Sequence, residues 1–191
     1  MNHMRANQRS EMSDKFDQFV KKQVESSKSG GGQIDLEKEK SMWLQKLDQL
    51  YSLIEDGLSD YIKDGSIRLS FVETTLTEDL LGTYAVREAH ITIGTQSVKL
   101  RPLGTFLIGA RGRVDMTGPR GITRFTIVPP DATAPRVRVT VLSPGQTPPQ
   151  QEAVAPPETW VWKIATPPPR ITYIDLTPET FREALIGVVN G

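Results

Sequence analysis

The chain has 191 residues, with 23 basic and 23 acidic side chains and a formal net charge of zero, a length that predicts one domain large enough to bury a core. It contains no cysteine, which excludes disulfides, thiolate nucleophiles and cysteine-based zinc sites. No run approaches the roughly 18 apolar residues that cross a membrane, and the start lacks an apolar secretion segment, so we expect a cytoplasmic protein without membrane contact.

The first 32 residues are expected to stand apart from the main domain. Residues 1–12 are predicted to be a disordered leader. Residues 13–32 are predicted to contain a short amphipathic helix and a flexible hinge at Ser26–Gly32, where serine and glycine leave nothing to bury. A single domain is then predicted to span residues 33–191.

A strong helical period runs from about Asp35 to Lys63. Its main apolar stripe contains Trp43, Leu47, Leu50 and Ile54, flanked by further apolar side chains. Such a wide apolar arc favours a helix that lies across a sheet. The alternative is a homodimer through the same stripe, although the seam is shorter than a coiled coil needs.

After Gly65 the hydrophobic period changes from 3.6 to 2, which predicts strands. Gly94–Gln96 predicts a hairpin turn and Gly118–Gly121 a second turn. Glycines 109 and 112 are interpreted as marks of a β-bulge or of a close helix contact. The predicted strands are Ile67–Val72, Ala89–Ile93, Val98–Arg101, Thr105–Met116, Ile122–Val128, Arg136–Leu142, Trp160–Ile164 and Ile171–Asp175.

The last third combines a proline-rich loop with a well-marked helix. Residues 144–159 contain five prolines and predict an extended, exposed loop. Thr177 is a candidate N-cap and Pro178 fits the first helical position, so a C-terminal helix is predicted. The expected fold is α+β: an antiparallel β-meander of about six to eight strands, covered on one face by the long helix and the C-terminal helix.

Basic residues are concentrated in the middle of this neutral chain. From residue 99 to 138 there are eight basic side chains and two acidic ones. Strand alternation places most of them on one sheet face, and arginine suits carboxylate or phosphate recognition. The alternative is an ordinary solvated face, neutralised by the chain's own carboxylates. The predicted partner-binding residues are Lys99, Arg101, Arg111, Arg113, Arg124, Arg136 and Arg138, with Arg68 and His90 beside them.

The favoured partner of this face is an acidic protein surface. Nucleic acid is the alternative, but single-strand binders pair basic residues with exposed aromatic rings. The aromatic residues of this region fall on the inward parity, and the chain as a whole is not basic. The sequence therefore favours a non-enzymatic accessory protein, of a neutralising or immunity-like kind. These inward aromatic residues are Phe106, Phe125, Trp160 and Trp162.

Catalytic side chains are scarce. His90 is the one imidazole outside the leader, and a hydrolase or nuclease built on Glu88, His90 and Asp115 is a further alternative. No spacing of His, Asp and Glu resembles a metal-binding motif, and the glycines near residue 109 lack the lysine of a phosphate-binding loop. We therefore expect neither a metal nor a cofactor.

Overall fold

The computed structural model describes residues 35–105, 110–135 and 155–191. Glu37–Gly191 form one compact unit. The predicted leader, first helix and hinge, the strand at Arg136–Leu142 and most of the proline-rich loop lie outside the described residues. The elements are α2 (Leu36–Lys63), β1 (Ile67–Glu78), β2 (Gly82–Ile93), β3 (Gln96–Gly104), β4 (Arg113–Gly118), β5 (Gly121–Val128), η1 (Pro157–Thr159), β6 (Val161–Ala165), β7 (Tyr173–Asp175) and α3 (Pro178–Asn190).

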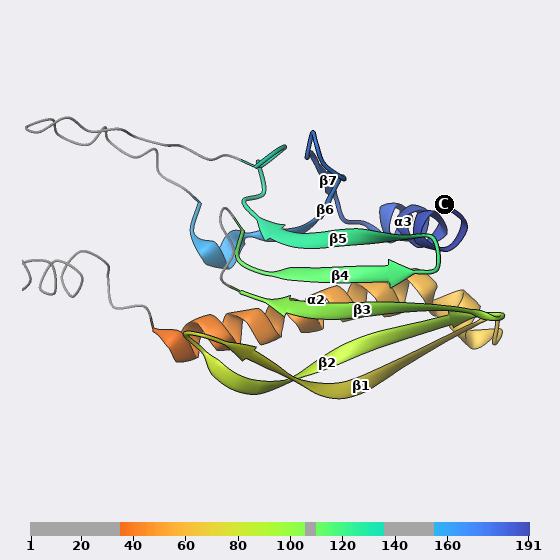
Figure 1. Cartoon of the computed structure of the whole chain (residues 1–191), viewed down its shortest axis with the longest axis horizontal. Helices are drawn as coiled ribbons and strands as arrows, with labels where there is room; N and C mark the ends of the chain where they lie inside the picture. The colour runs from red at the N-terminus through yellow and green to blue at the C-terminus, as the bar shows by residue number, and fades with distance from the viewer. Residues whose placement is uncertain (1–34, 106–109, 136–154) are drawn as a thin grey trace, which may run out of the picture. The chain divides into compact units, whose positions relative to one another are not determined.

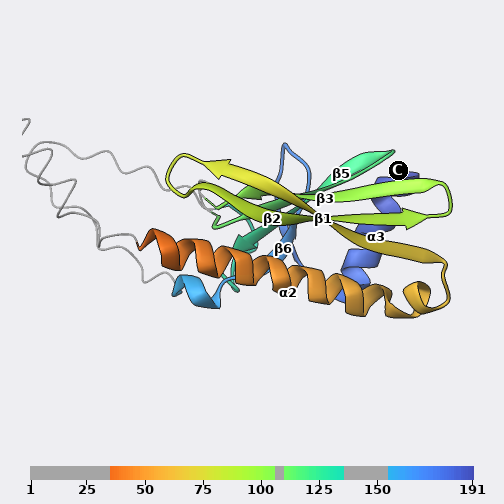
Figure 2. The same ribbon diagram turned by 90° about the horizontal axis from the view of Figure 1, so that it is seen from below.

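The strands form one seven-stranded antiparallel sheet in the order β1 to β7, so each strand pairs with its neighbour in the chain (Figure 1). This meander confirms the predicted α+β fold. The helix α2 runs along one side of the sheet (Figure 2). The helix α3 packs on the same side, since Phe181 contacts the inward-facing Phe125 at 6.1 Å between ring centroids. The opposite face carries no helix among the described residues.

The apolar stripe of α2 faces the sheet. The ring of Trp43 lies 6.0 Å from that of Trp162 on β6, and the indole of Trp162 donates a hydrogen bond to the Lys46 carbonyl at 2.7 Å. The four stripe residues are at most 2% exposed, which leaves none of them available to a second copy. The proposed homodimer seam is therefore replaced by packing within the chain. These residues are Trp43, Leu47, Leu50 and Ile54.

Thr177 is the N-cap of α3, as predicted, and it forms a capping box with Thr180. The Thr177 hydroxyl accepts from the Thr180 amide, and the Thr180 hydroxyl accepts from the Thr177 amide. The helix meets α2 where Gly57 lies close to Pro178, because a Cβ at residue 57 would stand 3.3 Å from the proline Cβ. Arg182 also donates to the Gly57 carbonyl at 3.0 Å. The glycine that interrupts the apolar stripe is thus a helix contact.

The β1–β2 hairpin is longer than its alternating pattern predicts. Each strand has twelve residues. At the tip, the Glu78 carboxylate accepts from the Tyr84 hydroxyl and from the amide and hydroxyl of Thr105, the latter two at 2.7 and 3.0 Å. These bonds tie the hairpin tip to the end of β3. Burial, together with the bond to the carboxylate, raises the pKa of Tyr84, so the phenol stays a donor.

A β-bulge precedes β4. The Arg111 amide donates to the Ile127 carbonyl, and the Ile127 amide donates to the Gly112 carbonyl, both at 3.0 Å, so two residues oppose one. A Cβ at residue 112 would lie 2.5 Å from Trp43 Cζ3. A bulge and a close helix contact were the alternatives for Gly112, and the structure has both there, while Gly109 lies outside the described residues. The continuous strand predicted for Thr105–Met116 is wrong, because Thr105 follows β3 and β4 begins only after the bulge.

We predict that Gly112→Ala destabilises the fold. The added methyl would press on Trp43 and on Ile127, both buried, so the free energy of unfolding should fall by about 1–3 kcal/mol. Urea denaturation measures this change. The control is Gly121→Ala, where a Cβ meets no atom within 4 Å, and where the change should stay within about 0.5 kcal/mol. Equal stability of the two variants would contradict the contact.

Candidate functional site

The strand registers define which side chains share the face opposite the helices. His90 pairs with Lys99, and Arg101 pairs with Asp115, which pairs in turn with Arg124. Directly paired residues point to the same side of a sheet. We call this surface the polar face. Its described charged side chains are Arg68, Glu88, His90, Lys99, Arg101, Arg113, Asp115, Arg124, Lys163 and Asp175.

One aspartate stands among three arginines at the centre of the polar face. Arg101 and Arg124 lie directly opposite Asp115 on either side. The Asp115 carboxylate accepts two hydrogen bonds from Arg113, each 2.7 Å long. These bonds raise the pKa of Arg113, so its guanidinium remains charged. One carboxylate thus balances one of three positive charges, and a positive excess remains.

The excess of positive charge on the polar face is carried by Lys99, Arg101 and Arg124. Lys99 and Arg101 are exposed and Arg124 is half-buried. Within residues 35–105, 110–135 and 155–191, none of the three forms an ion pair. Arg68, exposed on β1, shares this property. The predicted basic surface is therefore present in part, and the carboxylates of the described residues neutralise its charge only partly.

Arg111 does not belong to the polar face. It donates two hydrogen bonds to Glu39 on α2, at 2.7 and 2.6 Å, and its guanidinium lies 5.7 Å from the Trp160 ring centroid. The reason is the bulge at Gly112, which adds one residue to the strand and breaks the alternation that places Arg111 beside Arg113. Arg111 instead fastens the first turns of α2 to the sheet. Arg136 and Arg138, also predicted to bind, lie outside the described residues.

Sequence patterns missed Lys163, a buried lysine on the polar face. Its side chain is 7% exposed, and its ammonium lies 2.8 Å from the Asp175 carboxylate. It also donates to the Pro130 carbonyl at 2.7 Å. These bonds hold the segment after β5 and the edge strand β7 against the polar face. The sequence does show a single lysine among the apolar residues of β6. That pattern could have indicated a buried lysine, which needs a hydrogen-bond or ion-pair partner.

The three candidate catalytic residues are not assembled into one site. His90 Nε2 lies 2.7 Å from Glu88 Oε1. Asp115 is two strands away, at about 10 Å by strand spacing, and its two oxygens bind Arg113. The pair on β2 is therefore a local contact between neighbours on one face, with Lys99 as the charged residue directly opposite His90 and Asp115 out of reach.

The predicted inward aromatic residues lie on the helix-covered face where the structure describes them. Phe125 and Trp162 are buried, and Trp160 packs against the same core, while Phe106 lies outside the described residues. The described stretches of β3, β4 and β5 place no aromatic side chain on the polar face. On β7, Tyr173 pairs with Ala165, which lies opposite Arg124, so its ring is on the polar face two strands away from Arg124. The described strands that carry Lys99, Arg101 and Arg124 thus offer no stacking ring of their own.

Comparisons with family models, curated proteins and solved structures found no match to this chain. Among the described residues, no three His, Cys, Asp or Glu side chains gather in a way that could hold a metal ion. No helix in the described ranges has the length and apolar content to span a membrane.

We predict that Asp115→Asn lowers the free energy of unfolding by about 1 kcal/mol at low salt. The change removes the carboxylate that separates Arg101 from Arg124, so the arginines repel one another. Added salt screens this repulsion, and the loss of stability should shrink. Urea denaturation at two salt concentrations measures both effects. Asp131→Asn, at an exposed position, is the control, and a salt-independent loss at Asp115 would contradict the repulsion.

Proposed function

We propose that this chain is a non-enzymatic accessory protein that binds an acidic protein surface through Lys99, Arg101 and Arg124 on the polar face. The observation that carries the proposal is that these basic side chains have no ion-pair partner among the described residues, on the face opposite both helices. Clustered like charge favours a complementary partner, because association relieves the repulsion between the basic groups.

The spacing of the basic groups suits a protein partner. Lys99 and Arg101 are two residues apart on one strand, which separates them by about 7 Å. Arg101 and Arg124 are two strands apart, which separates them by about 10 Å. Charges so dispersed match several carboxylates on a folded surface better than a single phosphate group. The described parts of the three strands β3, β4 and β5 place no aromatic side chain on this face, which favours protein over single-stranded nucleic acid.

The proposal is tested with the variant Lys99→Glu/Arg101→Glu, which keeps Arg124 beside Asp115. Binding of fluorescent polyglutamate and capture of acidic proteins from the source lysate should both weaken, the polyglutamate affinity by about tenfold. The matched control is Arg120→Glu/Arg170→Glu, which makes the same charge change at exposed positions outside the polar face. Equal binding by wild type and by the polar-face variant would overturn the proposal.

A titration with oligonucleotides distinguishes nucleic acid, the alternative partner, from an acidic protein. Single-stranded and duplex oligonucleotides are titrated against the wild type over a range of salt concentrations. Binding tighter than that of polyglutamate, with a steep fall against the logarithm of salt and a loss in the polar-face variant, would assign the face to nucleic acid instead. We expect weak oligonucleotide binding that the two double variants change equally.

A further inference from the structure

The outer side of α2 is acidic where the polar face is basic. From Leu47 to Ile62 the helix contains four acidic and no basic side chains, and all four are exposed. Asp48 pairs with Arg87 at 2.7 Å and Asp60 approaches Lys63 at 4.0 Å. Glu55 and Asp56 form no ion pair within the part of the chain that the structure describes. The four residues are Asp48, Glu55, Asp56 and Asp60.

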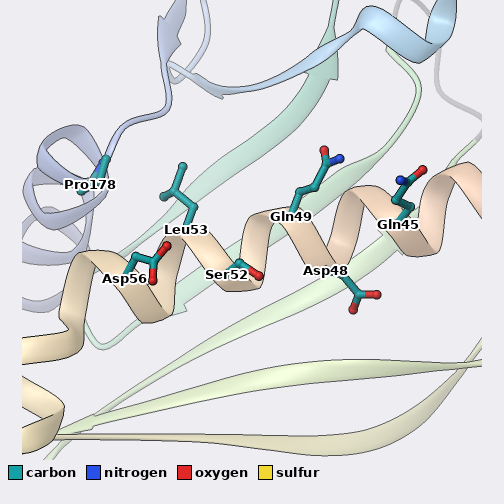
Figure 3. A pocket seen from close by; sticks show the side chains of 7 residues that line it. All are labelled: Gln45, Asp48, Gln49, Ser52, Leu53, Asp56 and Pro178. Carbon is teal, nitrogen blue, oxygen red and sulfur yellow. The ribbon is translucent and has the colours of Figure 1, made fainter.

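A shallow groove of about 580 Å³ lies along this acidic side. Gln49, Ser52 and Asp56 line it from α2, and Pro178 closes it at the start of α3 (Figure 3). Leu53 adds an apolar side chain between the polar ones. The groove therefore offers carboxylates together with a small apolar contact, on the side of the molecule away from the polar face.

The two surfaces match in charge and in spacing. Asp48, which also pairs with Arg87, and Glu55 are seven positions apart on the helix, about 10 Å along the axis. This equals the distance of about 10 Å across two strands between Arg101 and Arg124. Asp56 and Asp60 are about 6 Å apart along the axis, close to the distance of about 7 Å between Lys99 and Arg101. The net charge of zero means that two copies do not repel each other overall.

We infer that the acidic surface bound by the polar face is the outer side of α2 on a second copy of this chain. This inference rests on the proposed function and names its partner. Because the two surfaces lie on opposite sides of the molecule, the contact is head to tail and does not close into a dimer. Association should therefore grow with protein concentration, and it should be weak, since exposed ion pairs contribute little each.

Sedimentation equilibrium of the full chain tests the inference. At low salt and high protein concentration, the weight-average mass of the wild type should rise above the 21.3 kDa of one chain. In about 1 M salt, where the screening length is about 3 Å, it should return to that value. Glu55→Lys/Asp56→Lys and Lys99→Glu/Arg101→Glu should each remain at the mass of one chain at low salt.

Mixing the two variants supplies the decisive step. The reversed polar face of one variant fits the reversed helix of the other, and the unchanged surfaces also fit, so an equimolar mixture should regain the low-salt mass increase. The control Arg120→Glu/Arg170→Glu should associate on its own. If Lys99→Glu/Arg101→Glu does not fold, Lys99→Gln/Arg101→Gln takes its place in the measurement on a single variant. This variant should also stay at the mass of one chain.

Three outcomes would overturn the inference: a wild type that stays at 21.3 kDa at low salt, association that survives in either charge-reversed variant, or a mixture that regains nothing. The polyglutamate titration remains independent of these results. A monomeric wild type that binds polyglutamate through Lys99 and Arg101 would remove the second copy as partner and leave the proposed function standing. If the wild type neither associates nor binds polyglutamate, the proposed binding face is contradicted as well.

Discussion

The approach of Trp43 to the backbone at Gly112 is the contact on which the polar face depends. The indole of α2 rests where a Cβ would stand 2.5 Å from its ring, so the sheet must present a glycine at this point. The same glycine lies in the bulge opposite Ile127. The bulge turns Arg111 towards Glu39 and leaves Arg113 to pair with Asp115. Docking of α2 and the composition of the polar face are therefore set together.

Local patterns were sufficient for the meander, because alternation, short turns and a capping sequence each act over a few residues. They indicated a bulge or a close helix contact at Gly112, but they could not show that the bulge turns Arg111 away from Arg113, since the two arginines have the same parity in the sequence. They also missed half of the β1–β2 hairpin. Phe71, near the base of the hairpin, and Leu76, near its tip, both pack against the core although they have opposite parity. A strongly twisted hairpin can bury one of its faces at the base and the other face at the tip.

Prediction of the site failed where the decisive partner was distant in the chain. Lys99, Arg101, Arg113 and Arg124 share the polar face, as alternation requires. The contact between Glu39 and Arg111 joins residues 72 positions apart, and the bonds from Lys163 to Pro130 and Asp175 depend on the folded positions of three segments. No window of neighbouring residues contains that information. Charge counts predict a basic region, and only the fold determines which charges remain unpaired.

The number of arginines that the polar face can hold is limited by their mutual repulsion. Asp115 lowers this repulsion in the free protein, because it lies between Arg101 and Arg124 and binds Arg113. A further internal carboxylate would stabilise the fold more, and it would also remove the charge on which the proposed binding depends. A single aspartate among three arginines thus leaves some repulsion in the free chain, which is the repulsion that the proposed acidic partner would relieve.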